Sequence, residues 1–538
     1  MGVLKEIFPT LSQIPEEWRL DGLIEQREYL VNGELRLWNG EMNEVVSPVS
    51  INKDGIVQRN VIGSTPLLTE KESLEALEAA VHAYNNGTGE WPTMSIAKRI
   101  THVEKFLLEM KRQRAVVVKL LMWEIGKNLP DSEKEFDRTC IYIEDTIREL
   151  KNLDRGNSKF ENEEGIIAQT RRVPLGVALC MGPYNYPLNE TFTTLIPALI
   201  MGNTVVFKPA KYGVLFIKPL LTVFRDCFPK GVINIIYGKG KETVGVMMET
   251  GKIDVFAFIG TNKGASDIKK LHPKPHRLRG VLGLDAKNPA IVLLDADIDS
   301  TVNECVAGSL SYNGQRCTAL KIIFVHENIA DSFIKKYTDA VGKLKCGMPW
   351  DKDVKITPLP ETGKTKYLTE LVNDAKKFGA NIINENGGEV NDTFFYPAVL
   401  YPVNAQMRVY TEEQFGPVVP IVPYKNLEEV IDYVVQSNFG QQLSIFGNNS
   451  KTIGYLIDEL ANQVGRININ AQCQRGPDAY PFNGRKDSAE GTLSVGDALR
   501  AFSIRILIST KDNAQNKEIV QTIVREHQSS YLRLDYIF

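Results

Sequence analysis

Residues 175–208, with the sequence LGVALCMGPYNYPLNETFTTLIPALIMGNTVVFK, decide the fold. The apolar run at 175–180 predicts a strand, residues 190–201 predict a helix, and residues 204–207 predict a second strand. The alternation continues downstream, with strands expected at 232–236 and 255–259 and helices at 214–227, at 241–249 and from Asn262 onward. Short apolar strands that alternate with helices are typical of a parallel sheet covered by helices. We therefore expect an α/β protein.

The alternation resumes beyond this first region. A new set of strands and helices begins at residues 290–293 and runs to about residue 490, which predicts a second α/β domain. Residues 1–63 are expected to be irregular, apart from short strands such as 28–31. Apolar residues at helical spacing then predict helices at 70–86, 95–125 and 131–152.

The end of the chain alternates apolar and polar residues and predicts late strands at 501–509 and 531–538. Strands that follow both domains need an edge with which to pair. Residues 165–173 are a candidate partner, in the same chain or in another subunit.

Composition excludes several functional classes. The chain has 538 residues, 43% of them hydrophobic, and a net charge of -3, which gives no basic footprint for nucleic acid. No apolar run reaches the 18 or so residues of a membrane span, and the first 18 residues do not resemble a signal peptide. The seven cysteines form no CxxC pair and the six histidines lack ligand spacing, so we expect no metal site. Unclustered cysteines fit a reducing compartment, and we expect a cytoplasmic protein.

One cysteine lies in a suggestive place. The stretch Ser311-Tyr312-Asn313-Gly314-Gln315-Arg316-Cys317-Thr318 is a polar turn between an amphipathic run at 299–310 and an apolar run at 320–325. A cysteine where a helix meets a strand suits a nucleophile. The alternative is a small buried hydrophobic residue, the usual role of a free cysteine.

Three turns follow predicted strands and suit phosphate groups. They are Gly238-Lys239-Gly240, the segment from Phe258 through Gly260 and Thr261 to Gly264, and Lys208-Pro209-Ala210-Lys211. Glycine lets the backbone approach a phosphate, and free N–H groups at a helix start attract anions. Ligands of open parallel sheets bind at these strand ends. The pattern favours a dinucleotide, with ordinary glycine-rich turns as the alternative.

Five motifs occur in an order that resembles the aldehyde dehydrogenase superfamily. They are Pro183-Tyr184-Asn185-Tyr186-Pro187-Leu188, Lys208-Pro209-Ala210, Phe258-Ile259-Gly260-Thr261, Gly314-Gln315-Arg316-Cys317 and Glu413-Gln414-Phe415-Gly416-Pro417. The stretches Gly314-Gln315-Arg316-Cys317-Thr318-Ala319 and Gln474-Arg475-Gly476-Pro477-Asp478 are most similar to the non-phosphorylating NADP-dependent glyceraldehyde-3-phosphate dehydrogenases.

The resemblance implies an aldehyde dehydrogenase-like α/β fold with a Rossmann-type cofactor domain, a catalytic domain and a small β oligomerisation arm. The expected boundaries are 1–157 with 176–289 for the NAD(P)-binding domain, 290–495 for the catalytic domain, and 158–175 with 496–538 for the arm and tail. A homodimer or homotetramer is expected.

The resemblance also implies roles for single residues. Cys317 would attack the aldehyde, Asn185 and the Cys317 N–H would stabilise the oxyanion, and a thioester would form. The residues expected to bind the cofactor are Lys208, Lys211, Gly240, Gly260, Thr261, Glu413 and Phe415. Many NAD-preferring relatives carry an acidic residue at position 211, so Lys211 favours NADP, with NAD possible. A solvent-facing Lys211 without effect is the alternative.

The expected substrate is a small phosphorylated aldehyde, glyceraldehyde 3-phosphate, oxidised to 3-phosphoglycerate. Arginine suits phosphate through its planar fork, so Arg316 and Arg475 are the first candidates, followed by Arg138 and the hydroxyl of Tyr186. Each could instead be a surface ion-pair residue.

The chain departs from the family at the general base. The family's glutamate lies four residues before a lysine, and that position here, counted back from Lys287, is Gly283. Asp285 is the nearest carboxylate and the expected base. Alternatively, another carboxylate serves, the thioester passes to coenzyme A, or the protein binds nucleotide with little turnover.

Overall fold

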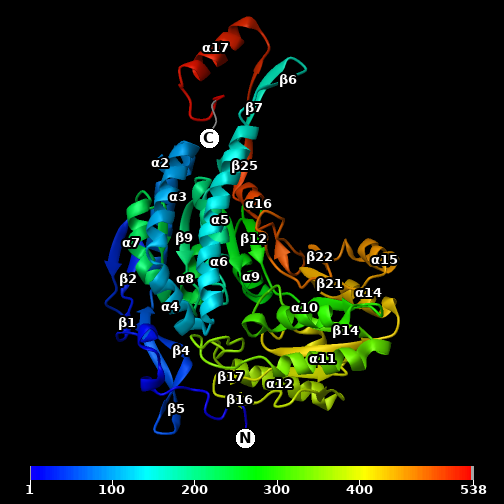
Figure 1. Cartoon of the computed structure of the whole chain (residues 1–538). Helices are drawn as coiled ribbons and strands as arrows, with labels where there is room; N and C mark the ends of the chain where they lie inside the picture. The colour runs from blue at the N-terminus through cyan, green and yellow to red at the C-terminus, as the bar shows by residue number, and fades with distance from the viewer. Residues whose placement is uncertain (1, 535–538) are drawn as a thin grey trace.

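The computed structural model describes residues 2–534, and Figure 1 shows their arrangement. The first sheet has the strand order β24-β12-β11-β8-β9-β10-β2-β3. Its parallel strands are β8 (Val177–Met181), β9 (Thr204–Lys208), β10 (Ile233–Ile235), β11 (Val255–Ile259) and β12 (Arg279–Gly283). The strands β2 (Glu28–Val31), β3 (Glu34–Leu37) and β24 (Ala489–Glu490) add antiparallel edges. The alternation predicted around residues 175–208 is confirmed.

The strand order reverses beside β8, because β9 lies on one side of it and β11 on the other. Crossovers between parallel strands are right-handed, so the helices of the two directions cover opposite faces. One face carries α6 (Asn189–Ile200) and α7 (Lys218–Cys227), and the other carries α8 (Gly240–Glu249) and α9 (Asn262–Lys269). Such a switch point opens a crevice at the carboxyl ends of the two central strands.

The second sheet has the order β15-β18-β19-β14-β13-β21-β22. Its strands are β13 (Asn288–Val292), β14 (Leu320–His326), β15 (Asn381–Ile382), β18 (Ala398–Tyr401), β19 (Val418–Tyr424), β21 (Gln442–Phe446) and β22 (Arg466–Ile469). Its helices are α10 (Ile298–Leu310), α11 (Ala330–Gly342), α12 (Lys364–Lys377), α14 (Leu427–Gln436) and α15 (Ser450–Leu460). The chain therefore changes sheets between Gly283 and Asn288, next to the crevice.

The expectation of an irregular start is wrong. A long hairpin joins β4 (Met42–Lys53) to β5 (Ile56–Pro66) through the two-residue turn Asp54-Gly55. Both turn residues have positive φ, at 53° and 87°, as this tight hairpin turn requires. The Asp-Gly pair was a usable sequence signal. Pro48 and register shifts within the hairpin hid the alternation around it.

The helices before the first sheet are α1 (Glu70–Tyr84), α3 (Ile96–Lys111), α4 (Arg114–Ile125) and α5 (Leu129–Gly156). The single helix predicted at 95–125 is thus wrong, since it is divided at Arg112 and Gln113. Neither residue is a helix breaker by type, so tertiary packing of the two segments decides the break.

A separate sheet with the order β25-β7-β6 extends from the body at the top of Figure 1. It contains β6 (Glu161–Glu163), β7 (Ile166–Pro174) and β25 (Ser503–Lys511). β25 pairs antiparallel with β7 from Ser503 opposite Pro174 to Lys511 opposite Ile166. The pairing predicted for the late strand is confirmed within the same chain.

The chain then forms α17 (Ala514–Arg525), a helix that was not predicted. The strand expected at 531–538 is wrong for residues 531–534, and residues 535–538 lie outside the described part. Side chains hold this stretch in place of a strand ladder: Arg171 donates to the Tyr531 carbonyl at 2.8 Å and Gln169 to the Arg533 carbonyl at 2.7 Å.

Within residues 2–534, no helix is long and apolar enough to cross a bilayer. In the same range, no three His, Cys, Asp or Glu side chains gather as metal ligands.

Candidate active site

A cavity of about 470 Å³ lies where the two sheets meet. It opens at the carboxyl ends of β8 and β11, the crevice expected from the switch in strand order. Residues predicted from distant motifs line it together: Asn185, Gly260, Thr261, Asp285, Cys317, Glu413 and Phe415. The fold thus brings the predicted nucleophile, oxyanion amide, base and part of the cofactor set to one place.

The turn before Cys317 has an unusual backbone. Tyr312, Asn313 and Gly314 have φ values of 49°, 57° and 71°, so the chain runs left-handed for three residues. A Cβ at Gly314 would lie 2.7 Å from the Ser309 carbonyl oxygen, so the position requires glycine. The Asn313 side chain anchors the turn by donating to the Thr357 carbonyl at 3.1 Å. Sparsely populated conformations of this kind are typical of functional sites.

The Cys317 thiol is protonated at neutral pH in this state. Burial raises its pKa to about 11, the negative charge of Glu190 adds to the rise, and Arg475 opposes it. Attack on an aldehyde therefore needs a proton acceptor or a rearrangement when ligands bind.

Asn185 is held on both sides. Its side-chain amide donates to the Gln315 carbonyl at 2.8 Å, which places it against the Cys317 turn. Its own carbonyl accepts a hydrogen bond of 2.7 Å from Lys127. Lys127 is fully buried and paired with Glu135, which accepts the N–H of Leu188 at 3.0 Å. A buried ion pair thus supports the Asn185 loop.

Asp285 lies in the segment where the chain changes sheets. Its Oδ2 accepts the Asn262 N–H at 2.8 Å. Burial and the neighbouring charge of Glu413 raise its pKa to about 6, so the carboxyl exchanges a proton near neutral pH. Glu413 in turn pairs with buried Lys321 at 2.9 Å. The carboxyl therefore faces the Glu413 side of the cavity and has a pKa suited to a general base.

A second hollow of about 420 Å³ lies beside β9 and the start of α8. Lys208, Lys211 and Gly240 line it together, as expected for one cofactor site. Burial lowers the pKa of Lys208 to about 8, whereas Lys211 is exposed. Lys239 also lines the hollow and was not predicted as a site residue, although it lies in a turn that suits phosphate groups.

The donor set of this hollow fits a phosphorylated ribose. None of the described residues lining it is acidic, and three carry ammonium groups. Beside the first cavity, Thr261 caps α9 by accepting the Gly264 N–H at 3.1 Å. Gly260 and Thr261 therefore precede a helix start, where backbone N–H groups favour a pyrophosphate.

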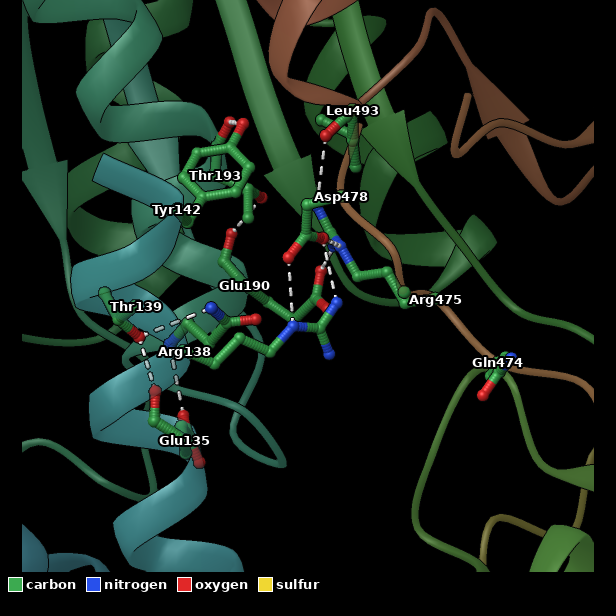
Figure 2. Close-up of polar contacts among 12 residues, drawn as sticks. Glu135, Arg138, Thr139, Tyr142, Glu190, Thr193, Gln474, Arg475, Asp478 and Leu493 are labelled. Carbon is green, nitrogen blue, oxygen red and sulfur yellow. Dashed lines mark hydrogen bonds and ion pairs between the residues drawn. The ribbon is translucent and has the colours of Figure 1, made fainter. Parts of the chain in front are cut away.

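The four residues proposed for the substrate phosphate all have protein partners. Arg316 donates to the Gly308 carbonyl at 2.9 Å, and Lys127 lies 3.6 Å from the ring centre of Tyr186. Arg138 and Arg475 both bind Asp478, and Arg475 also pairs with Glu190 (Figure 2). None of these four residues is among the described residues that line the first cavity. Glu190, the partner of Arg475, does line it.

The comparisons with known proteins agree with this geometry. The model named Aldehyde dehydrogenase family matches residues 50–505. The chain belongs to the aldehyde dehydrogenase family. It is an NAD(P)-dependent aldehyde dehydrogenase, so the family and enzyme class predicted from the five motifs are confirmed.

Three similar family members carry the same enzyme name in their descriptions. The NADP-dependent glyceraldehyde-3-phosphate dehydrogenase of Triticum aestivum is 32% identical, over 89% of this chain and 94% of the relative. The Streptococcus equinus enzyme of that name is 31% identical, over 89% and 98%. The crystal structure of the Bacillus halodurans enzyme complexed with NADP has a TM-score of 0.81 at 31% identity, covering 90% of this chain and 99% of that one. The predicted aldehyde dehydrogenase fold is confirmed.

Proposed function

We propose that this aldehyde dehydrogenase oxidises glyceraldehyde 3-phosphate to 3-phosphoglycerate with NADP, through a thioester on Cys317. The observation that carries the proposal is the meeting of Cys317, Asn185 and Asp285 at one cavity beside Glu413. The relatives named for this substrate and cofactor, at 31–32% identity over most of the chain, support the specific choice.

In the first half-reaction, the Cys317 thiol releases its proton to water, and the thiolate Sγ bonds to the aldehyde carbon. The Asn185 amide and the Cys317 N–H stabilise the oxygen that becomes negative. NADP, when bound, supplies the acceptor for the hydride that leaves this carbon. Glu413 and Phe415 would hold the nicotinamide end, and Gly260 and Thr261 the pyrophosphate.

In the second half-reaction, Asp285 takes a proton from water, and the water oxygen bonds to the thioester carbon. The C–S bond breaks, Cys317 leaves as the thiolate, and the acid is released. A carboxyl with a pKa of about 6 is ionised at neutral pH and can accept this proton. Asp285 thus serves as the general base in place of the family's glutamate, whose position is occupied here by Gly283.

For the cofactor, we assign the adenosine ribose and its 2′-phosphate to the hollow formed by Lys208, Lys211 and Gly240. Ammonium groups attract a 2′-phosphate, and a carboxylate at position 211 would repel it. Lys239 joins this set, although its ammonium also lies 3.6 Å from Glu242.

Gly283 favours a competing function, in which coenzyme A and not water accepts the acyl group. Pre-steady-state kinetics separate the two. The full chain, mixed with NADP and glyceraldehyde 3-phosphate, should form NADPH in a burst stoichiometric with subunits, followed by a steady rate. A burst that stops and is rescued by coenzyme A would reject hydrolysis. The absence of a burst would indicate a nucleotide-binding protein.

The nucleophile is tested separately. Cys317→Ala should abolish the burst, because Cys317 is the one cysteine among the described residues that line the cavity. Cys346→Ala is the matched control, since Cys346 is also only partly buried and lies outside the cavity. Loss of the burst in the control and not in Cys317→Ala would contradict the assignment.

A further inference from the structure

Two arginines and two carboxylates form a continuous ionic chain beside the cavity (Figure 2). Arg138 binds Asp478 through two nitrogens, at 2.8 and 3.0 Å. Asp478 also accepts from the Nε of Arg475 at 3.2 Å. The Nη1 of Arg475 pairs with the Oε2 of Glu190. The four groups together carry no net charge.

The inner part of this chain is buried. The side chains of Arg475, Asp478 and Glu190 are 4%, 9% and 8% exposed, whereas Arg138 is 27% exposed. Arg475 also donates to the Leu493 carbonyl at 3.1 Å and lies over the Phe482 ring. A guanidinium buried this deeply requires nearby negative charge, which Glu190 and Asp478 provide.

The two ends of the Glu190–Arg475 pair have different surroundings. Glu190 lines the cavity that contains Cys317, and its charge reaches the Cys317 thiol. Arg475 is not among the described residues that line the cavity. An anion that enters the cavity therefore meets the Glu190 carboxylate before it reaches the guanidinium.

We propose that Glu190 is a specificity-determining residue that competes with the substrate's phosphate for Arg475. This rests on the proposed function, which brings a phosphorylated aldehyde to Cys317. A phosphate dianion that pairs with Arg475 repels the carboxylate already bound there, so Glu190 has to move aside. Glu190 keeps the buried arginine compensated when the site is empty, and it weakens phosphate binding. Its return to Arg475 would favour release of the phosphorylated product.

The test measures inorganic phosphate as a competitor for the cavity, without aldehyde or NADP. Iodoacetamide alkylates Cys317, and phosphate seated on Arg475 slows the reaction. In Glu190→Gln, the phosphate concentration that halves the rate should fall about tenfold, the change that 1.4 kcal/mol of lost competition produces. Rates are normalised to the phosphate-free rate of each variant, because loss of the charge also changes the reactivity of the thiol.

Glu361→Gln is the matched control. Glu361 lines the same cavity, but it pairs with Lys364 at 3.0 Å and does not contact Arg475. Its half-protection concentration, which is the phosphate concentration that halves the alkylation rate, should stay at the wild-type value. Glu190→Leu cannot accept a hydrogen bond from Arg475, so its half-protection concentration should fall at least as far as that of Glu190→Gln. A thermal melt of each variant verifies folding.

Three results would overturn the proposal. The first is an unchanged half-protection concentration in both Glu190 variants. The second is a higher half-protection concentration, which would show that Glu190 orients Arg475 for phosphate. The third is the absence of protection by phosphate in every variant. If the wild type turns over glyceraldehyde 3-phosphate and the Glu190 variants show unchanged protection, only the role of Glu190 is rejected and the proposed reaction stands. A missing NADPH burst with the expected protection shift would reject only the proposed reaction.

Discussion

Asp285 stands two positions from the place where the family's motif puts its base, yet its carboxyl lines the same cavity as Cys317. A two-residue shift was readable from the sequence, but its effect on side-chain direction was not. In a regular strand it would keep the face and move the side chain along it. Here β12 ends at Gly283, and the chain turns toward the second sheet.

Asp285→Asn should leave the NADPH burst intact and lower the steady rate by about 10²–10⁴-fold, the usual contribution of a general base. In the wild type, the steady rate should rise with pH through about 6, because the carboxyl accepts a proton only when ionised. Stopped-flow measurement between about pH 5 and 8 checks both results. Asp285→Glu should retain part of the rate. An unchanged steady rate in Asp285→Asn would assign the base elsewhere.

Cofactor choice is also a matter of single residues. Lys211→Glu should raise the KM for NADP by about tenfold or more, the effect of 1.4 kcal/mol, because it places a carboxylate beside the 2′-phosphate. The KM for NAD should change little. Lys211 is exposed, so thermal stability should stay the same. Equal changes for both cofactors, measured by steady-state kinetics, would show that position 211 does not face the ribose.

Motif order predicted Cys317, Asn185 and Glu413 because each lies in a short, recognisable stretch. Glu190 and Arg475 are 285 positions apart, and their pairing arises only when the two sheets come together. The buried ion pair of Lys127 and Glu135 was not predicted, for a related reason. Charged residues are almost never fully buried unless paired, and the sequence does not display the partner. Local motifs were therefore visible, whereas the contacts that support them were not.

At the scale of elements, the loop after β8 depends on helix α5 and the residues before it. Lys127 supports the Asn185 carbonyl, and Glu135 receives the N–H groups of Leu188 and Asn189 at 3.0 and 3.2 Å. The start of α6 and the oxyanion amide are thus supported by one buried pair, so stability and catalysis should respond together.

Lys127→Met should reduce the free energy of unfolding by about 3–5 kcal/mol, because it leaves Glu135 buried without its partner. The double variant Lys127→Met with Glu135→Leu should recover part of that loss. Both should have slower bursts, since Asn185 is less well held. Urea unfolding and burst kinetics test this. A single variant as stable as the wild type would mean that Glu135 is neutral or hydrated.

The elements themselves were predictable to different degrees. Strands β8, β9 and β11 and the helices between them follow from short local patterns. The hairpin of β4 and β5 was missed because its signal is a two-residue turn flanked by irregular pairing. Helix α17 was missed as well. Its apolar residues Ile519, Val520, Ile523 and Val524 do recur at helical spacing, so this helix could have been predicted from the sequence.

At the scale of the whole molecule, the β25-β7-β6 sheet leaves large apolar side chains uncovered. Leu507 and Ile504 on β25 are 63% and 50% exposed. Exposed apolar side chains on a protruding sheet are typical of an interface with another protein surface. The predicted homodimer or homotetramer and the assignment of this sheet as an oligomerisation arm stay predictions, as do the domain boundaries.

Leu507→Asp should shift the chain toward the monomer, because it places a charge on the uncovered face of the arm. Analytical ultracentrifugation measures the change, and Lys511→Asp at the exposed end of the same strand is the control. The NADPH burst should persist, since the described residues that line the cavity include none from β25. A wild-type chain that sediments as a monomer would reject the arm's role.

The path of the chain between the two sheets has a consequence for a molecule whose backbone is broken there. Strand β24 joins the first sheet only after the second sheet has been completed, and β25 then returns to β7. A break in the backbone between the sheets, within residues 284–287, would therefore release neither half. The two pieces would stay joined by the pairing of β24 with β12 and of β25 with β7, and they would separate only under denaturing conditions.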